Sequence, residues 1–289
     1  MIATSCPLCG ARDGARVAVT VDVARLVRCA QCGLFYKDPL PAEGIRRHYE
    51  DLYRRHDTAS EHIDQRRRDL FRGFLTEVPP FGARRLLDVG CGSGEFLVLA
   101  RDQGWTADGV EVSRRGAALA RRRGLAVYET PADLPADHFD AVTLWNVVDF
   151  FLQPIEQMQQ IRRVARPGGL VFLRTPNALF QAAAWRLSCI VVWPPPLARL
   201  VADAHFFQPL VWSPSTLRRL LLGAGFTDVR VWNSRVSYGD PYHRASAGRE
   251  QLVAGVKRVV HALATGIYRG SGGRLIVGSS ISAAARKPH

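Results

Sequence analysis

The sequence predicts an α/β protein, with a doubly wound, seven-stranded sheet behind a small N-terminal module that contains four cysteines. Three observations carry this prediction. From residue 84 onward, short apolar runs alternate with amphipathic helical stretches, which is typical of a mainly parallel sheet covered by helices on both faces. Two CxxC pairs fall within the first 32 residues. Residues 42–82 between these regions are polar with helical spacing, which predicts a helical connector.

The N-terminal unit, residues 1–41, is expected to be a zinc ribbon. Two CxxC turns can aim four thiolates at one tetrahedral ion, and the ligands would be Cys6, Cys9, Cys29 and Cys32. A unit of this size has too little core to fold well alone, so a bound structural metal would stabilise it. A redox pair and free buried thiols are the alternatives. With four protein ligands the ion has no open position, and no catalysis is assigned to it.

The main domain is expected over residues 83–289, and its elements follow from periodicity and from helix-ending glycines and prolines. Strands are expected at 84–90, 105–113, 125–130, 139–148, 170–176, 226–236 and 272–287. Helices are expected at 94–104, 114–124, 154–166, 213–226 and 248–267, with two more in the connector at about 42–54 and 60–78. Ser213 is a suitable N-cap, with Pro214 at the first helical position.

One segment breaks this alternation. Residues 178–212 are apolar, rich in Trp, Phe and Pro, and without clear period. The segment follows the fifth strand and so lies at the carboxyl ends of the strands, where such sheets bind ligands. We expect a substrate lid; a dimer surface and plain core are the alternatives.

A glycine-rich turn follows the first strand of the main domain. Gly90, Gly92 and Gly94 permit a sharp strand-to-helix turn and let a ligand approach the backbone. Such turns bind both dinucleotides and S-adenosylmethionine, so the turn alone does not identify the cofactor. Asp88, just before the glycines, disfavours a pyrophosphate and suits an ammonium group. Glu111 ends the second strand, where a carboxylate can accept both ribose hydroxyls.

A third acid, Asp133, follows the third strand, where it could accept a hydrogen bond from an adenine amino group. Its alternative role is that of a turn or N-cap residue. Three acids around the glycines favour a cationic adenosine ligand over a dinucleotide.

The chain resembles the class I S-adenosylmethionine-dependent methyltransferases. The motifs that carry the resemblance are LLDVGCGSGEFL, VEVS, FDAVTLWNVVDFF, RRVARPGGLVFLRTPN and SPSTLRRLLLGAGF. More narrowly, it resembles a bacterial subgroup with an N-terminal CxxC…CxxC module followed by a phrase like GLFYKDP. The resemblance implies a Rossmann-like fold, S-adenosylmethionine as the cofactor, and a small-molecule, sugar or secondary-metabolite acceptor.

The resemblance also implies roles for individual residues. The glycines would lie under the methionine part of the cofactor, with Asp88 orienting its amino group, Glu111 binding the ribose and Asp133 near the adenine. Asn146 follows the fourth strand, at a cofactor-side position where the subgroup often has His. Asp149-Phe150 replaces the usual Glu-His pair, which puts in doubt any base contributed by that loop.

Methyl transfer from a sulfonium mainly requires positioning and desolvation, although an oxygen or nitrogen acceptor can need a general base. His205 matches a His-Phe element of the relatives and is the first catalytic candidate. A structural histidine under the lid is the alternative. His243 is the second candidate.

Charge and targeting signals bear on partners. The net charge of +13 comes almost wholly from dispersed arginines, which is typical of solvated faces and also suits an anionic substrate. No appended RNA-binding domain is recognisable, so RNA methylation is the second hypothesis and nucleic acid is not the expected partner. Peripheral membrane contact through 178–212 is a further hypothesis. No secretory signal is visible, which predicts a cytoplasmic location.

Two other functional hypotheses remain open. A non-catalytic cofactor-binding or scaffold protein would fit the replaced residues after the fourth strand, whereas an NAD enzyme is the least favoured. The sequence does not predict the oligomeric state or the acceptor atom.

Overall fold

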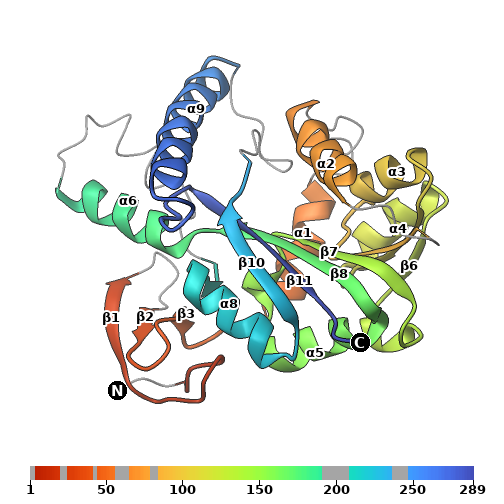
Figure 1. The fold of residues 1–289 in the computed structure, drawn as a ribbon, viewed down its shortest axis with the longest axis horizontal. Coiled ribbons are helices and arrows are strands. Elements are labelled where there is room, and N and C mark those ends of the chain that lie inside the picture. Colours follow the sequence, from red (N-terminus) through yellow and green to blue (C-terminus); the bar gives the residue numbers. More distant parts are fainter. Residues whose placement is uncertain are drawn as a thin grey trace.

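The computed structural model describes residues 4–19, 25–41, 44–55, 65–78, 84–190, 208–235 and 247–289. Two sheets organise these residues (Figure 1). The larger has seven strands in the order β10-β11-β8-β7-β4-β5-β6. In chain order its strands are β4 (Arg85–Val89), β5 (Thr106–Val110), β6 (Ala126–Tyr128), β7 (Phe139–Trp145), β8 (Ala165–Pro176), β10 (Thr227–Asn233) and β11 (Ser280–Arg286). The doubly wound, seven-stranded Rossmann-like sheet predicted from the sequence is confirmed.

The strand order reverses at β4, which lies between β5 and β7 and is parallel to both. The chain runs outward through β5 and β6, returns to β7 on the other side of β4, and continues to β8. Ligands of such sheets bind outside the carboxyl ends of the strands at this switch point. β11 is antiparallel to β8 and β10, so one strand departs from the parallel pattern.

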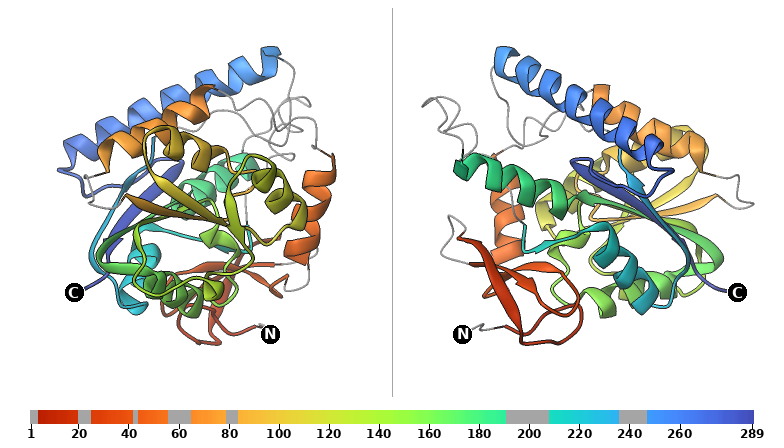
Figure 2. Two further views of the ribbon diagram at one scale, coloured as in Figure 1. Left: turned by 90° about the vertical axis from the view of Figure 1, so that its right-hand side faces the viewer. Right: turned by 60° about the vertical axis from the view of Figure 1, so that its left-hand side comes forward.

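Helices cover both faces of the large sheet (Figure 2). On one face, α2 (Gln65–Glu77), α3 (Glu95–Asp102) and α4 (Arg114–Arg122) contribute to one buried apolar cluster. On the other, α5 (Pro154–Val164) and α8 (Pro214–Gly223) pack over a second. The remaining helices are α1 (Gly44–Arg55), α6 (Ala178–Ile190) and α9 (Ala247–Gly270), with 3-10 turns η2 (Pro131–Asp133) and η3 (Val148–Phe150). Leu86 and Leu87 of β4 are fully buried, one in each cluster.

Local signals explain where the helices begin and end. Ser213 caps α8 by accepting a hydrogen bond from the Thr216 amide, and Pro214 occupies the first turn, as predicted. Gly104 and Gly124 follow α3 and α4 at φ values of 83° and 72°, in the left-handed region where a glycine costs least.

The smaller sheet holds the cysteine module and has the order β1-β2-β3-β9. Its strands are β1 (Gly14–Val19), β2 (Arg25–Cys29), β3 (Phe35–Asp38) and β9 (Leu210–Val211), all antiparallel to their neighbours. β9 comes from the segment 178–212, about 170 residues after β3 in the chain. The pairing of this segment with the module was not predicted.

Two further differences from the predicted elements stand out. Residues 178–190 form α6, although their apolar residues lack a clear helical period. The final strand covers only Ser280–Arg286 of the expected range 272–287. Within the part of the chain that the structure describes, no helix is both long and apolar enough to cross a bilayer.

Candidate functional site

The glycine turn lies between β4 and α3 at the switch point. Gly90, Gly92 and Gly94 have φ values of 73°, 58° and 80°. The Gly90 amide donates to the Val110 carbonyl of β5 (2.7 Å), which fixes the turn against the neighbouring strand. A Cβ at Gly90 would lie 2.4 Å from a methyl group of Val147. The turn therefore needs glycine at this position for both conformation and space.

Glu111 closes the turn from the end of β5. One carboxylate oxygen accepts a hydrogen bond from the Gly92 amide and the other from the Ser113 amide, each at 2.8 Å. The side chain is 7% exposed, and its burial raises the pKa of the carboxyl. Each oxygen has a further lone pair, so the pair of oxygens can also accept from two vicinal hydroxyls. Binding of the ribose hydroxyls stays a prediction for Glu111.

Asp88, the last acid before the turn, is buried on the α2 face of the sheet. The Thr143 hydroxyl of β7 donates to its Oδ1 at 2.7 Å. Burial raises the pKa of this carboxyl to about 7, against the opposing effects of the Thr143 hydrogen bond and the charge of Arg67. A bound ammonium group would favour the ionised form. The position therefore fits the predicted amino-group partner.

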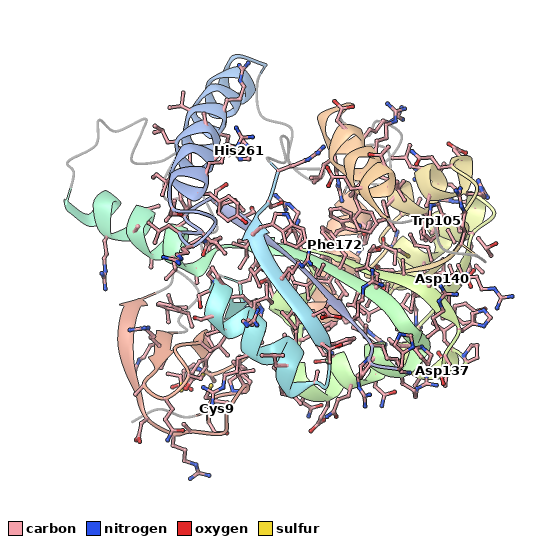
Figure 3. The ribbon with its side chains drawn as sticks, viewed as in Figure 1. Cys9, Trp105, Asp137, Asp140, Phe172 and His261 are labelled. Carbon is pink, nitrogen blue, oxygen red and sulfur yellow. The ribbon has the colours of Figure 1, made fainter. Side chains whose placement is uncertain are left out.

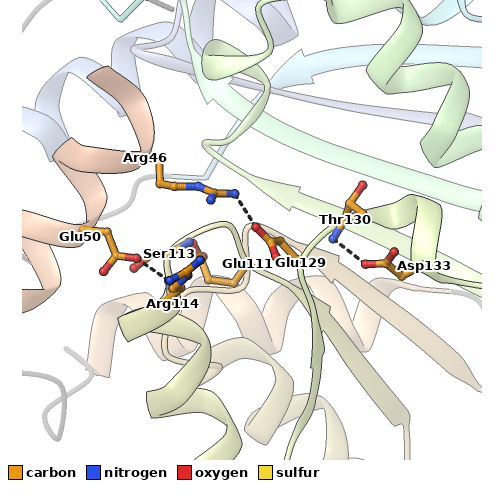
Figure 4. Close-up of polar contacts among 8 residues, drawn as sticks. All are labelled: Arg46, Glu50, Glu111, Ser113, Arg114, Glu129, Thr130 and Asp133. Carbon is orange, nitrogen blue, oxygen red and sulfur yellow. Dashed lines mark hydrogen bonds and ion pairs between the residues drawn. The ribbon is translucent and has the colours of Figure 1, made fainter. Parts of the chain in front are cut away.

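Asp133 is exposed and caps its own turn. It ends η2, where the Thr130 amide donates to its Oδ2 at 3.4 Å and the Thr130 hydroxyl accepts from the Ala132 amide (Figure 4). This matches the alternative role of Asp133, that of a turn residue, expected from the sequence. Binding to an adenine stays a prediction for this residue.

Helix α1 covers the same edge of the sheet, beside the glycine turn (Figure 4). Arg46 forms an ion pair with Glu129 after β6, at 2.5 Å, and Glu50 accepts a hydrogen bond from the Arg114 amide at the start of α4. Buried Tyr53 packs so closely on Gly116 that a Cβ there would lie 2.9 Å from its ring. Sequence reasoning placed α1 in a connector and missed this contact, because a polar helix carries no signal of what it covers.

A second polar group gathers at the carboxyl ends of β7 and β8. Asn146 follows β7 with φ 58°, and its side-chain oxygen accepts from Arg174 of β8 at 2.8 Å. Arg174 also donates to the hydroxyls of Ser234 (2.9 Å) and Ser280 (3.2 Å). Sequence reasoning missed Arg174; the available signal was an arginine inside the otherwise apolar run LVFLRTP.

Asp149 lies on η3, next to this group. It is buried and accepts a hydrogen bond from the Thr175 hydroxyl. Its burial raises the pKa of the carboxyl to about 7. Asp149 is therefore a buried acid that is tied to β8.

The predicted base and most of the predicted lid cannot be placed. His205 and His243 lie outside the described residues, as do 191–207 of the segment 178–212. The described parts of that segment are α6 and the stretch around β9. Trp212, fully buried, donates from its indole N–H to the Val148 carbonyl of η3 at 3.3 Å.

The four N-terminal cysteines form one cluster in the ribbon. Their Sγ atoms all lie within 4.8 Å of one another, and the pairs Cys6–Cys32 and Cys9–Cys29 are 3.5 Å apart. These distances are too long for disulfides and near the roughly 3.8 Å that tetrahedral Zn–S bonds of about 2.3 Å impose. The donor set therefore fits structural zinc. Figure 3 shows Cys9 in the module, well away from Phe172 in the large sheet.

Comparisons with known proteins agree with this geometry. A family model described as "Methyltransferase domain" matches residues 61–231. A ubiquinone biosynthesis O-methyltransferase of Caulobacter sp. is 30% identical over 157 residues, which are 50% of this chain and 60% of the relative. The chain spans about half to three-fifths of the length of the curated relatives it matches.

Two solved structures share the fold. A chain in the complex between the Haloferax volcanii Trm112 methyltransferase activator and a methyltransferase has a TM-score of 0.55 and 17% identity, covering 85% of this chain and 98% of that one. An S-adenosylmethionine-dependent methyltransferase from Thermotoga maritima has a TM-score of 0.50 and 18% identity, covering 83% and 100%. The family match covers more than half of the sequence, so the chain belongs to the methyltransferase-domain family and has the fold of the class I S-adenosylmethionine-dependent enzymes.

Proposed function

We propose that the protein transfers a methyl group from S-adenosylmethionine to a small-molecule acceptor at the carboxyl edge of β4, β7 and β8. The observation that carries the proposal is the pair of buried acids at the glycine turn, Glu111 on the Gly92 amide and Asp88 on Thr143. A dinucleotide would bring its pyrophosphate close to both carboxylates, which is unfavourable. An adenosine ligand with an ammonium group would interact favourably with both carboxylates.

The cofactor would supply a methyl group bonded to a cationic sulfur, and this sulfur is a good leaving group. The residues of the protein therefore need to bind and orient the reactants and exclude water. Glu111 would accept the ribose hydroxyls, and Asp88 would orient the amino group. α1 shields this edge through Tyr53 and the Arg46–Glu129 ion pair. His205 remains the proposed base for an acceptor that must lose a proton.

A small acceptor is favoured over RNA for two reasons. The relative from Caulobacter is named for an O-methyl transfer in ubiquinone biosynthesis, which is chemistry on a small molecule. The chain also shows no motif of an RNA-binding module beside the methyltransferase domain. Zinc in the ribbon would be structural, because all four of its positions are taken by cysteine.

Calorimetric titration of the full, zinc-loaded chain with S-adenosylhomocysteine tests the proposal, with NAD as comparator. We expect binding of S-adenosylhomocysteine and none of NAD. Glu111→Ala should abolish it, whereas Glu156→Ala, an exposed acid on α5 at the opposite face, should not. Absence of binding by folded protein would favour a scaffold role, and strongly salt-dependent RNA binding would favour RNA as the substrate.

A further inference from the structure

Arg174 is a buried cation that forms no ion pair with an acidic side chain among the described residues. Its side chain is 5% exposed at the carboxyl end of β8. A guanidinium out of water loses several kcal/mol of hydration unless an anion and a full set of acceptors replace it. Among the residues that the structure describes, the hydrogen-bond partners of Arg174 are the neutral oxygens of Asn146, Ser234 and Ser280.

The nearby charges do not neutralise Arg174. Arg67 on α2 adds positive charge, and together with burial it lowers the pKa of Arg174 to about 10. Arg67 has its own acidic partner in Glu95, at 3.7 Å. Asp149 is also buried and attracts Arg174 without a hydrogen bond between them, and burial raises the pKa of the Asp149 carboxyl to about 7. The positive charge of Arg174 is therefore only partly compensated at this end of the sheet.

Arg174 and its neighbour Trp145 have hydrogen-bond donors that the described residues do not use. The guanidinium has five N–H groups, and the three acceptors above use one on Nε and one on each Nη. Within the described part of the chain, the buried indole N–H of Trp145 has no acceptor either. Trp145 and Arg174 are direct register partners on β7 and β8, so their side chains leave the same face of the sheet as neighbours. Among the described residues, two guanidinium N–H groups and one indole N–H therefore remain without an acceptor.

This group of donors lies on the acceptor side of the cofactor turn. Asp88 pairs in register with Thr143 on β7, and Trp145 is two residues further along the same strand. Arg174 is one strand beyond, so the Cα atoms of Arg174 and Asp88 are roughly 12 Å apart by strand geometry. Asn146, which binds Arg174, is exposed at the strand end and connects the group to solvent.

We propose that Arg174 and the Trp145 indole N–H bind a carboxylate on the methyl acceptor, so that the substrate is an anionic small molecule held by its carboxyl group. This inference rests on the proposed function. A carboxylate fits because its single negative charge would complete the compensation of the Arg174 guanidinium, and its two oxygens can accept from the free N–H groups of the fork. A phosphate dianion would bring a second negative charge for which the described residues offer no partner.

The test uses the full zinc-loaded chain saturated with S-adenosylhomocysteine, titrated with benzoate, its neutral isostere benzamide, and phenyl phosphate. We expect benzoate to bind at least tenfold more tightly than benzamide and more tightly than phenyl phosphate. Equal affinity for benzoate and benzamide would overturn the proposal. Tighter binding of phenyl phosphate would overturn the assignment to a carboxylate.

Variants locate the site. Arg174→Gln should weaken benzoate binding at least tenfold, and Trp145→Phe, which keeps the ring packing but removes the N–H, about threefold to tenfold. Arg230→Gln, an exposed arginine on β10, is the matched control and should leave benzoate affinity unchanged. If Arg174→Gln does not fold, the Trp145→Phe variant and the wild-type comparison of benzoate with benzamide still test the proposal.

Titration with S-adenosylhomocysteine separates this inference from the proposed function. The Arg174→Gln variant should bind it within about twofold of the wild type. A tenfold loss would mean that the guanidinium binds the cofactor's own carboxylate, which would overturn the inference and leave the cofactor assignment intact. Failure of the wild type to bind S-adenosylhomocysteine would instead refute the proposed function.

Discussion

Replacing Asp88 by Asn should make the ligand-free protein more stable at alkaline pH while weakening the cofactor site. The wild-type carboxyl is buried, and its pKa is raised from 3.8 to about 7. The folded state therefore binds this proton more strongly than the unfolded state does. The stability that the protonated group contributes is complete below pH 3.8 and is lost as the pH rises through about 7.

The size of the effect follows from the shift. One pKa unit corresponds to about 1.4 kcal/mol, so full ionisation of Asp88 costs the folded state about 4 kcal/mol. About 2.5 kcal/mol of this cost arises between pH 5 and pH 8. Asn cannot ionise, and its side-chain oxygen can still accept from the Thr143 hydroxyl. The variant should therefore gain about 2.5 kcal/mol over the wild type between these two pH values.

Urea unfolding followed by circular dichroism at pH 5 and pH 8, without ligand, measures this difference. Asp102→Asn, at an exposed position of α3, is the control for the general effect of removing an aspartate. The reasoning would be refuted if the difference between Asp88→Asn and the wild type were the same at both pH values. Calorimetry at pH 8 should show weaker binding of S-adenosylhomocysteine by the stabilised variant.

Three further results are expected. Glu111→Gln places an amide NH2 group where one carboxylate oxygen accepts a hydrogen bond from a backbone amide. Calorimetry should therefore show at least tenfold weaker binding of S-adenosylhomocysteine, and unchanged affinity would contradict the ribose role. Gly90→Ala puts a Cβ at a positive φ against Val147 and should lower the free energy of unfolding by at least about 1–2 kcal/mol in urea, and an unchanged midpoint would contradict the described turn. Elemental analysis should find about one zinc per chain and Cys9→Ser should lower the melting temperature, whereas metal-free protein of equal stability would exclude a structural ion.

The elements of the main domain could be predicted from the sequence because each is short and strongly patterned. The apolar run at Leu86 and Leu87 needs burial on both faces, which the centre of a parallel sheet provides. The cap at Ser213 and the glycines after α3 and α4 fixed the helix ends locally. α6 was missed because its apolar residues lack a helical period; Ala178 and Ala182 pack in a cluster with Leu26 and Phe35, which are distant in sequence.

The site was predictable where a residue acts close to its own motif. Glu111 and Asp88 lie on or beside the strands that flank the glycine turn, so their positions follow from the βα order alone. Arg174 was not predictable, because its role depends on Ser234 and Ser280, which β10 and β11 bring from 60 and 106 residues away. Asp133 shows that a local motif can also be ambiguous. An acid at this position can cap its own turn with Thr130 or contact a ligand, and the sequence pattern is the same in both cases.

The pairing of β3 with β9 joins the cysteine module to the side of the large sheet where we propose that the acceptor binds. The module and the α5 face of the large sheet share one apolar core, in which Tyr36 and Trp212 are fully buried. Trp212 in turn fixes η3 through the Val148 carbonyl, two residues after Asn146. Metal binding in the module would therefore stabilise the carboxyl end of β7, whereas Glu111 lies on the far side of β4 from this contact. A structural ion here should support the acceptor side more than the cofactor side, without approaching the methyl group that is transferred.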